Sequence, residues 1–290
     1  METRRDIQRE RLFYIEFLAI FTGRVRRKDL VDRFGISDAA ATKDLSLYGD
    51  IASGVLTYDL KQKCYVLTGD SYYFTHSIDQ ALFSLVGERA IATETGHAER
   101  LDGWVNTSIK RSMPLDIVSA ITRCMFQKRT MDAEYTSHSS GKKIRSLTPL
   151  ALVNDGLRWH IRCRNNHAEN EFKDYNLARF TSVSEGELSD ANLESDDEWN
   201  QYVCLELVPH PKLEYPETTV LDYEITDGCK QVTLRSCFVG YFLRFWPIDF
   251  TDDASANPKA KQLFLRNKAD LLSQGVSKWA LVDDSRKSAD

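Results

Sequence analysis

Apolar residues recur at helical spacing through the first fifty positions and then give way to strand-like alternation. Arg5–Phe21 forms a first amphipathic segment, and Arg27–Gly35 forms a second that stops at a glycine suited to a sharp turn. A third segment begins at Ser37, a good helix N-cap, and after Gly54 the pattern VLTYD changes to period two, as in a hairpin. The order helix, turn, helix, hairpin predicts a winged helix-turn-helix.

The third segment, Ser37–Tyr48, is predicted to be a recognition helix lying in a major groove. Its spacing turns Ala41, Leu45 and Tyr48 inward and leaves short or polar side chains outside, while two lysines of the hairpin turn suit phosphate. The same spacing also occurs in helical bundles that bind no DNA, so the pattern alone leaves both interpretations open. The predicted DNA-contacting residues are Arg27, Ser37, Ala40, Thr42, Lys43, Ser46, Lys61 and Lys63.

The remaining pattern predicts a linker and two further folded parts. A helical block, IDQALFSLVGERAI, precedes a polar, glycine-bearing stretch at 95–103, and Pro114 is placed to start another helix. From Met131 to Val183, short alternating runs separated by turns predict about five antiparallel strands in a strongly bent sheet or Sm-like barrel. The last third reads as strand, helix, strand and an aromatic-rich helix, whose predicted core or dimer seam is Tyr241, Phe242, Phe245 and Trp246.

Composition narrows the function classes. A chain of 290 residues with 42% apolar content suggests two or three domains, and it has no apolar run of the roughly 18 residues that a membrane helix needs. The charged start METRRDIQRERL is unlike a secretion signal, so we expect a soluble, cytoplasmic protein. The six cysteines contain no C-x-x-C pair, and we expect neither a metal nor another cofactor. Basic residues crowd the N-terminal segment and acidic ones crowd 185–227, which favours DNA contact at the N-terminal end.

The strand LRWHIRCR carries a second feature with chemistry in it. Alternation sends Trp159, Ile161 and Cys163 to a core face and puts His160, Arg162 and Arg164 on the other. Guanidinium groups suit phosphates, so this row could form a ligand site on a concave side of the sheet. Alternatively, it is a solvated face whose arginines pair with Glu134, Glu169, Glu171 and Asp174. The site residues would be Tyr135, Arg145, Ser146, His160, Arg162 and Arg179.

These motifs resemble a WYL domain. An alternating strand ends in Tyr135, R-x-x-x-P follows at Arg145–Pro149, G-x-x-W-[YH]-[LI] at Gly156–Ile161, and L-x-R-[IF] at Leu177–Phe180. In that family the Trp is core, whereas the middle residue of the triplet and several arginines line a pocket for nucleotide or nucleic-acid signals. The resemblance assigns the pocket to Tyr135, Arg145, His160, Arg162 and Arg179. Here His160 replaces the usual Tyr, and the final strand has one arginine and one aspartate fewer than the family pattern.

The resemblance extends over nearly the whole chain, to the phage-defence repressors called BrxR in BREX islands and CapW in CBASS islands. It implies an α+β protein that forms a homodimer, represses a defence operon and releases DNA when its WYL domain senses an infection signal. The expected domains are a winged helix at 1–70, a helical linker at 71–112, a WYL domain at 113–190 and a C-terminal α/β (WCX-type) dimerisation domain at 200–290.

The predicted function is therefore sequence-specific transcriptional repression at a double-stranded, inverted-repeat operator, because a two-fold protein presents two recognition helices. An activator of the same family is one alternative. Another is a phosphodiesterase with His160 as general base near Arg145 and Arg162, although no metal-binding carboxylate cluster or activated nucleophile is visible in the sequence. A third is a signal-binding module that never contacts DNA.

Overall fold

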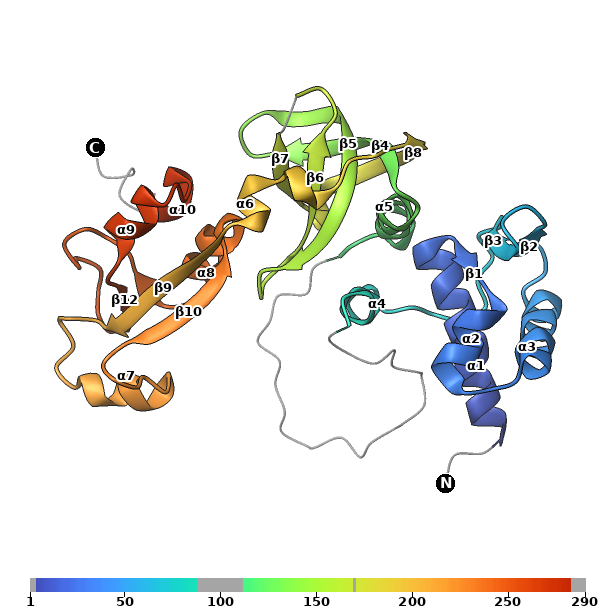
Figure 1. The fold of residues 1–290 in the computed structure, drawn as a ribbon, viewed down its shortest axis with the longest axis horizontal. Coiled ribbons are helices and arrows are strands. Elements are labelled where there is room, and N and C mark those ends of the chain that lie inside the picture. Colours follow the sequence, from blue (N-terminus) through green and yellow to red (C-terminus); the bar gives the residue numbers. More distant parts are fainter. Residues whose placement is uncertain (1–3, 88–111, 169–170, 283–290) are drawn as a thin grey trace. The chain divides into compact units, whose positions relative to one another are not determined.

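The computed structural model describes residues 4–87, 112–168 and 171–282 (Figure 1). Clustering of neighbouring residues divides the chain into two compact units. The first consists of residues 1–152 and 160–191, and the second of residues 153–159 and 192–290.

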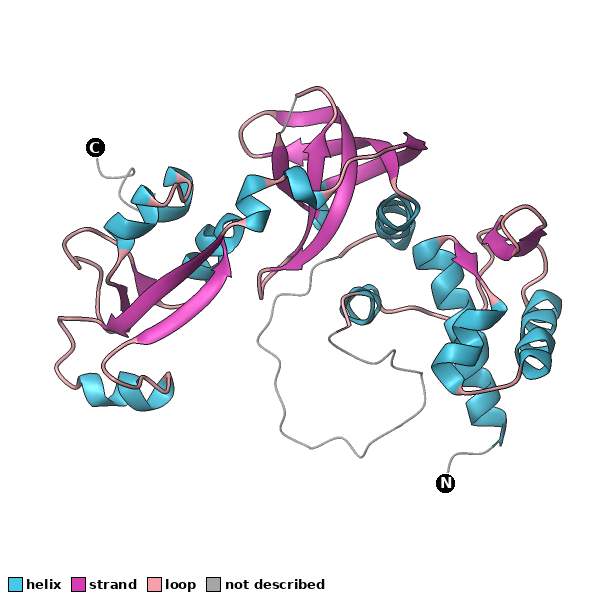
Figure 2. Cartoon of the chain, in the orientation of Figure 1, coloured by secondary structure: helices cyan, strands magenta, loops and turns pink. Residues whose placement is uncertain are grey.

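The N-terminal part of the first unit is a winged helix, as predicted (Figure 2). Gly35 ends the second helix with φ of 62°, and its N–H donates to the Val31 carbonyl at 2.9 Å, which confirms the glycine-terminated turn. The two-residue strand β1 was not predicted, because two residues cannot show alternation. The elements are α1 (Arg4–Thr22), β1 (Arg24–Val25), α2 (Arg27–Phe34), α3 (Asp38–Ile51), β2 (Leu56–Asp59) and β3 (Cys64–Leu67), with sheet order β1-β3-β2.

The amphipathic pattern predicted for the first helix corresponds to a buried side of α1. Leu12, Ile15, Phe17 and Phe21 of α1 are buried, whereas Leu18 is half-buried. After the wing, α4 (Ile78–Leu85) occupies the start of the predicted second helical block. The helix ends at Leu85, Val86 and Gly87 form a turn, and residues 88–91 of that block and the polar stretch at 95–103 lie outside the described residues.

The rest of the first unit contains one helix and a five-stranded antiparallel sheet. The strand order β7-β6-β5-β4-β8 leaves β7 and β8 at the edges, and no pairing joins them among the described residues, so the closed Sm-like barrel stays a prediction. The elements are α5 (Leu115–Gln127), β4 (Arg129–Ser137), β5 (Gly141–Asn154), β6 (Trp159–Asn165), β7 (Phe172–Asn176), the 3₁₀ turn η1 (Leu177–Arg179) and β8 (Phe180–Leu188).

The prediction that only one face of β6 is buried is wrong. Trp159, Ile161 and Cys163 are buried as predicted, but His160 and Arg162 are buried too, with 4% and 2% exposure. Arg162 is buried as one half of an ion pair with Asp174 of β7, so a polar residue type at alternate positions does not mark that face of β6 as solvent-exposed.

The second unit has a four-stranded sheet of order β10-β9-β12-β11 with short helices around it. The predicted strand, helix, strand, helix order is present as β9, α7, β10 and α8. Val239 and Leu243 form the buried side of α8, while Phe245 and Trp246 are each 40% exposed, so these two aromatics are not the core. The elements are η2 (Leu193–Ser195), α6 (Asp197–Asn200), β9 (Tyr202–Pro209), α7 (Pro216–Asp222), β10 (Lys230–Arg235), η3 (Ser236–Phe238), α8 (Val239–Phe245), β11 (Ile248–Asp249), β12 (Leu263–Leu265), α9 (Lys268–Ser273) and α10 (Lys278–Leu281).

Candidate nucleic-acid interface

The outward face of α3 presents the side chains that the sequence assigned to DNA. Thr42, Lys43 and Ser46 are exposed, and Ala40 is half-buried. The hydroxyl of Thr42 donates to the carbonyl of Asp38 at 2.8 Å, which fixes its rotamer and leaves its lone pairs available as acceptors. Ser37 is also exposed, but its hydroxyl accepts the N–H of Ala40 at 3.2 Å and thus serves as the helix cap.

A buried carboxylate holds the inner face of α3. Glu16 of α1 is fully buried, and it accepts hydrogen bonds from the Tyr48 hydroxyl (2.6 Å) and from the N–H groups of Tyr73 (2.7 Å) and Phe74 (2.8 Å). The Nε2 atom of His76 lies 3.0 Å from the same carboxylate. Burial alone would raise the pKa of Glu16, but these hydrogen bonds outweigh it and lower that pKa. Glu16 therefore connects α3 and the segment after the wing to α1.

A second buried carboxylate lies on α3 itself. Asp44 is 1% exposed and accepts from Arg11 Nε at 2.5 Å and from Gln8 Nε2 at 3.2 Å. It sits three residues after Ala41 and four before Tyr48, hence on the face predicted to be inward. This spacing could have revealed Asp44 in the sequence.

The wing turn is shaped by Asp59. Its carboxylate accepts the N–H groups of Gln62 (3.1 Å) and Lys61 (2.7 Å), and these backbone hydrogen bonds lower the pKa of Asp59. Lys63 closes the turn in the left-handed region, with φ of 52°. Lys61 and Lys63 are both exposed at the tip, as the phosphate-contact prediction requires.

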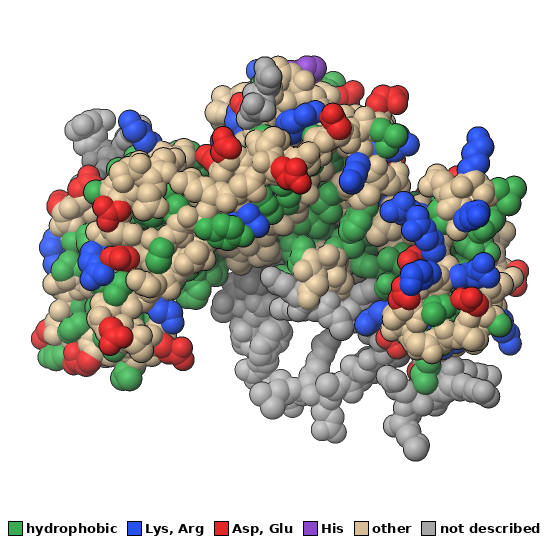
Figure 3. Space-filling view, viewed as in Figure 1, with side chains coloured by type: hydrophobic (Ala, Val, Ile, Leu, Met, Phe, Trp, Pro, Cys, Tyr) green, Lys and Arg blue, Asp and Glu red, His purple; other side chains and the backbone are tan. Residues whose placement is uncertain are grey.

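One groove brings together predicted residues from three elements. A cavity of about 190 Å³ is lined by Arg27 of α2, Thr42 of α3 and Lys63 of the wing, together with Arg26 and Tyr58, which the sequence interpretation did not select. Cys64 and Tyr65 complete the lining. Lysine and arginine side chains are numerous on the winged helix in the space-filling view (Figure 3). Lys43, Ser46 and Lys61 are exposed but do not line this groove.

In the WYL region, Arg145 lies against two aromatic rings. Its guanidinium carbon is 5.9 Å from the centre of the Tyr135 ring and 6.0 Å from that of Tyr175, and its Nη2 donates to Ser140 at 2.9 Å. The Nε of Arg145 is buried and has no hydrogen-bond partner among the described residues. Burial raises the pKa of Tyr175 to about 12, so its hydroxyl remains protonated.

The other predicted ligand residues do not join this cluster. Tyr175 is the cross-strand partner of Ile161, so His160 and Arg162 belong to the opposite face of the sheet. Arg162 Nη1 lies 3.2 Å from Asp174, one of the pairings that the alternative interpretation predicted. Ser146 follows Arg145 along β5 and so faces the other side, where it accepts from Asn166 at 3.3 Å. Arg179 Nη2 lies 2.7 Å from His138 Nε2.

Three family profiles match the chain in order. Residues 7–83 match the BrxR transcriptional regulator winged helix-turn-helix domain, 116–185 the WYL domain, and 202–271 the BrxR transcriptional regulator C-terminal dimerization domain. The chain is 31% identical over 278 residues to the DNA-binding transcriptional repressor CapW of Escherichia coli (strain KTE188), a match covering 91% of this chain and 90% of that one. It is 30% identical over 249 residues to CapW of Stenotrophomonas maltophilia, with 82% of each chain covered. The chain belongs to the BrxR/CapW family of WYL-domain transcriptional regulators.

Two of the three profile matches include the candidate sites. The winged-helix match contains Glu16 and the groove at Thr42, and the WYL match contains Arg145 with its two tyrosines.

No group of three potential metal ligands occurs in residues 4–87, 112–168 and 171–282. None of the described helices is long and apolar enough to cross a membrane.

Proposed function

We propose that this chain is a transcriptional repressor that binds double-stranded DNA through α3 and the wing. The observation that carries the proposal is the groove in which Arg27, Thr42 and Lys63 converge from three elements. On a recognition helix, a polar side chain such as Thr42 can contact base edges, and the two neighbouring cations, Arg27 and Lys63, can contact phosphates. The CapW relatives, named as DNA-binding transcriptional repressors, support the same conclusion.

The test is a gel shift with the DNA upstream of the chain's own gene, followed by a promoter fusion. Binding without cleavage, together with higher promoter activity in a deletion strain, is the expected result. Lower promoter activity in the deletion strain would mean an activator, and the absence of any binding would refute the DNA-binding proposal.

We further propose that the repressor is a homodimer acting at an inverted-repeat operator of a phage-defence operon. The match to a C-terminal dimerization domain supports the dimer, and two-fold symmetry then requires two half-sites. Protection footprinting should show two protected half-sites related by two-fold symmetry, whereas a single asymmetric footprint would contradict this geometry.

The proposed effector site is the side of the sheet with Arg145, where an anionic group of a nucleotide or oligonucleotide would bind. The Nε of Arg145 is buried with no hydrogen-bond partner in the part of the chain that the structure describes, and a bound anion would provide one. The Tyr135 hydroxyl, which accepts the N–H of Asn176 at 3.3 Å, can still donate to the same ligand. Of the other predicted ligand residues, His160 and Arg162 would support the sheet from its opposite face, and Arg179 remains a candidate at η1.

A further inference from the structure

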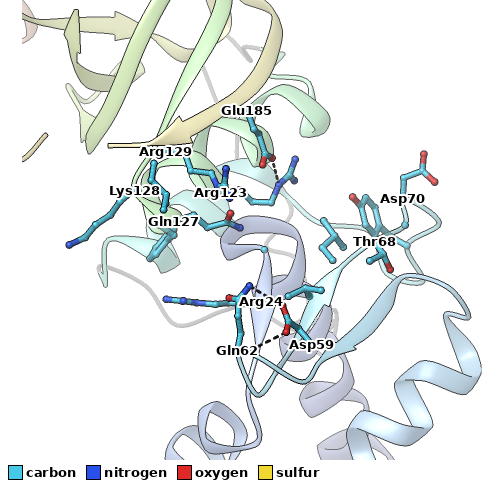
Figure 4. A pocket seen from close by; sticks show the side chains of 17 residues that line it. Arg24, Asp59, Gln62, Thr68, Asp70, Arg123, Gln127, Lys128, Arg129 and Glu185 are labelled. Carbon is cyan, nitrogen blue, oxygen red and sulfur yellow. Dashed lines mark hydrogen bonds and ion pairs between the residues drawn. The ribbon is translucent and has the colours of Figure 1, made fainter. Parts of the chain in front are cut away.

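The C-terminal end of α1 is capped by side chains of α5 (Figure 4). The last carbonyls of a helix have no partner within the helix, and α1 has no basic residue in its last turn. Arg123 Nη1 donates to the carbonyl of Ile20 at 3.2 Å, and Gln127 Nε2 donates to that of Thr22 at 3.4 Å. The winged helix therefore obtains this cap from the helix that begins the WYL region.

The same arginine also holds the WYL sheet. Arg123 Nε lies 2.9 Å from Oε1 of Glu185 in β8, and its Nη1 donates to Ser119 of α5 at 3.2 Å. One guanidinium thus joins α1, α5 and β8. Its planar set of donors allows three directed contacts at once, which a lysine ammonium on a flexible chain would not reproduce.

The contact is close and lies beside the wing. Gly23 has φ of 79°, which favours glycine, and a Cβ on it would lie 2.1 Å from Gln127 Nε2, so the Gln127 side chain would have to move away from its present position. The carbonyl of Gly23 accepts the N–H of Leu67, the last residue of β3, at 3.1 Å. The residue that bonds to the wing, Gly23, thus directly follows Thr22, whose carbonyl accepts from Gln127 of α5.

The Arg123–Glu185 pair is open to solvent, which suits it to a reversible contact. The two side chains are 18% and 36% exposed, and both line a cleft of about 1070 Å³ together with Arg24, Asp59 and Arg129 (Figure 4). Partly exposed ion pairs contribute little to stability. Breaking the Arg123–Glu185 pair should therefore change how α1 of the winged helix is held against α5 and β8 without unfolding these elements.

We infer that Arg123 is a positioning residue that couples the WYL sheet to the winged helix through Glu185 on one side and the end of α1 on the other. The inference rests on the proposed function and names how its DNA site is regulated. With the bridge intact, the recognition helices of a dimer are held at the spacing of two half-sites. When a change in the sheet moves β8, Glu185 shifts Arg123, and the cap on α1 moves with it.

The DNA test compares Arg123→Ala with Arg129→Ala. Arg129 lines the same cleft and carries the same charge, but its Nη1 donates to the Gly186 carbonyl of β8 at 2.9 Å, so it controls for lost charge. Fluorescence anisotropy would be measured on a two-half-site operator and on a duplex with one half-site scrambled. Because bivalent binding depends on geometry, Arg123→Ala should lose about tenfold affinity on the first duplex and less than about twofold on the second. Arg129→Ala should match wild type on both.

Equal losses on both duplexes, or none, would overturn the inference. Arg123→Ala and Glu185→Gln should also be non-additive on the two-site operator, since they break one contact. A wild-type protein that binds neither duplex would instead refute the proposed function.

A second measurement does not depend on DNA. In Glu185→Gln, hydrogen exchange should become faster at the amides of Gly23 and Leu67, although Glu185 itself contacts Arg123 rather than the winged helix. Arg129→Ala should leave those amides unchanged. Unchanged exchange in Glu185→Gln would contradict the coupling even if DNA binding is confirmed.

Discussion

At the scale of single residues, the buried carboxylate of Glu16 connects three segments of the winged helix. Glu16 has no exposure, yet its carboxylate remains satisfied because donors reach it from α3 and from the segment after the wing. A buried carboxylate with partners is tolerated, whereas removal of a partner leaves an unsatisfied group in a low-dielectric interior. The position of α3, the proposed recognition helix, thus depends on hydrogen bonds on its buried side.

Tyr48→Phe should therefore destabilise the protein by about 1–3 kcal/mol, because the hydroxyl at 2.6 Å from Glu16 is lost while the ring stays in place. Urea unfolding provides the measurement. The matched control is Tyr58→Phe in the wing, where the side chain is 45% exposed and the change should be within about 0.5 kcal/mol. Equal stabilities for the two variants would show that the buried hydrogen bond contributes nothing.

The lowered pKa of Glu16 also predicts a pH dependence. A carboxyl whose pKa is lower in the folded state stabilises the fold above its unfolded value of about 4.3, and this contribution is lost as pH falls through the folded pKa. The unfolding free energy of wild type should exceed that of Glu16→Gln near neutral pH, and the gap should narrow in acid. A gap that is constant with pH would mean that Glu16 is not ionised in the folded chain.

Sequence periodicity identified the inward Tyr48 but not its partner. Glu16 lies four residues after Leu12 and four before Ile20, so helical spacing places it on the buried side of α1, but the spacing does not show which groups donate to it. The donors to Glu16 come from positions more than thirty residues away, at Tyr48 and at Tyr73 to His76. Such tertiary hydrogen bonds are invisible in a local pattern.

At the scale of elements, the helices, the wing and strand β6 followed from the sequence, but the burial of both faces of β6 did not. The turn at Gly35 and the cap at Ser37 are local devices, so residue identity fixes them. The environment of β6 depends on its position between β5 and β7, which alternation cannot reveal. Arg162 therefore looked like a surface residue but is buried beside Asp174.

Thr42→Ala combined with Lys43→Ala should abolish operator binding and leave the dimer intact. Both side chains are exposed on α3, away from Leu45 and Tyr48, and each specific contact should contribute about 1–3 kcal/mol. Anisotropy titration gives the affinity, and sedimentation confirms the dimer. A folded, dimeric double mutant with wild-type affinity would exclude α3 as the recognition helix.

Salt dependence tests the cationic contacts of α2 and the wing. If Arg27, Lys61 and Lys63 of both subunits neutralise phosphates, log affinity should fall against log salt with a slope of roughly −0.9 for each contact. Lys63→Ala should make the slope less steep, whereas Lys28→Ala should change it less, because Lys28 already pairs with Asp32 at 3.0 Å. A slope near zero in wild type would contradict this docking mode.

At the scale of the whole molecule, the proposed effector acts on DNA binding without contacting DNA. Arg145 of β5 lies against Tyr135 and Tyr175, and the groove proposed to contact DNA is formed by α2, α3 and the wing. An effector can change operator affinity only by binding one conformation of the protein better than another. DNA affinity and effector response should therefore be separable by mutation.

Arg145→Ala is the variant that separates them. It should keep operator affinity near wild type and lose the response to a phosphate-bearing inducer, because it removes the guanidinium whose buried Nε is available to an anion. The measurement is a titration of short oligonucleotides and cyclic nucleotides against the protein–operator complex. Lys143→Ala is the matched control, since Lys143 is an exposed cation two residues earlier on the same strand, opposite Tyr135. Release of DNA by the same inducer at the same concentration from Arg145→Ala and wild type would place the effector site elsewhere in the chain.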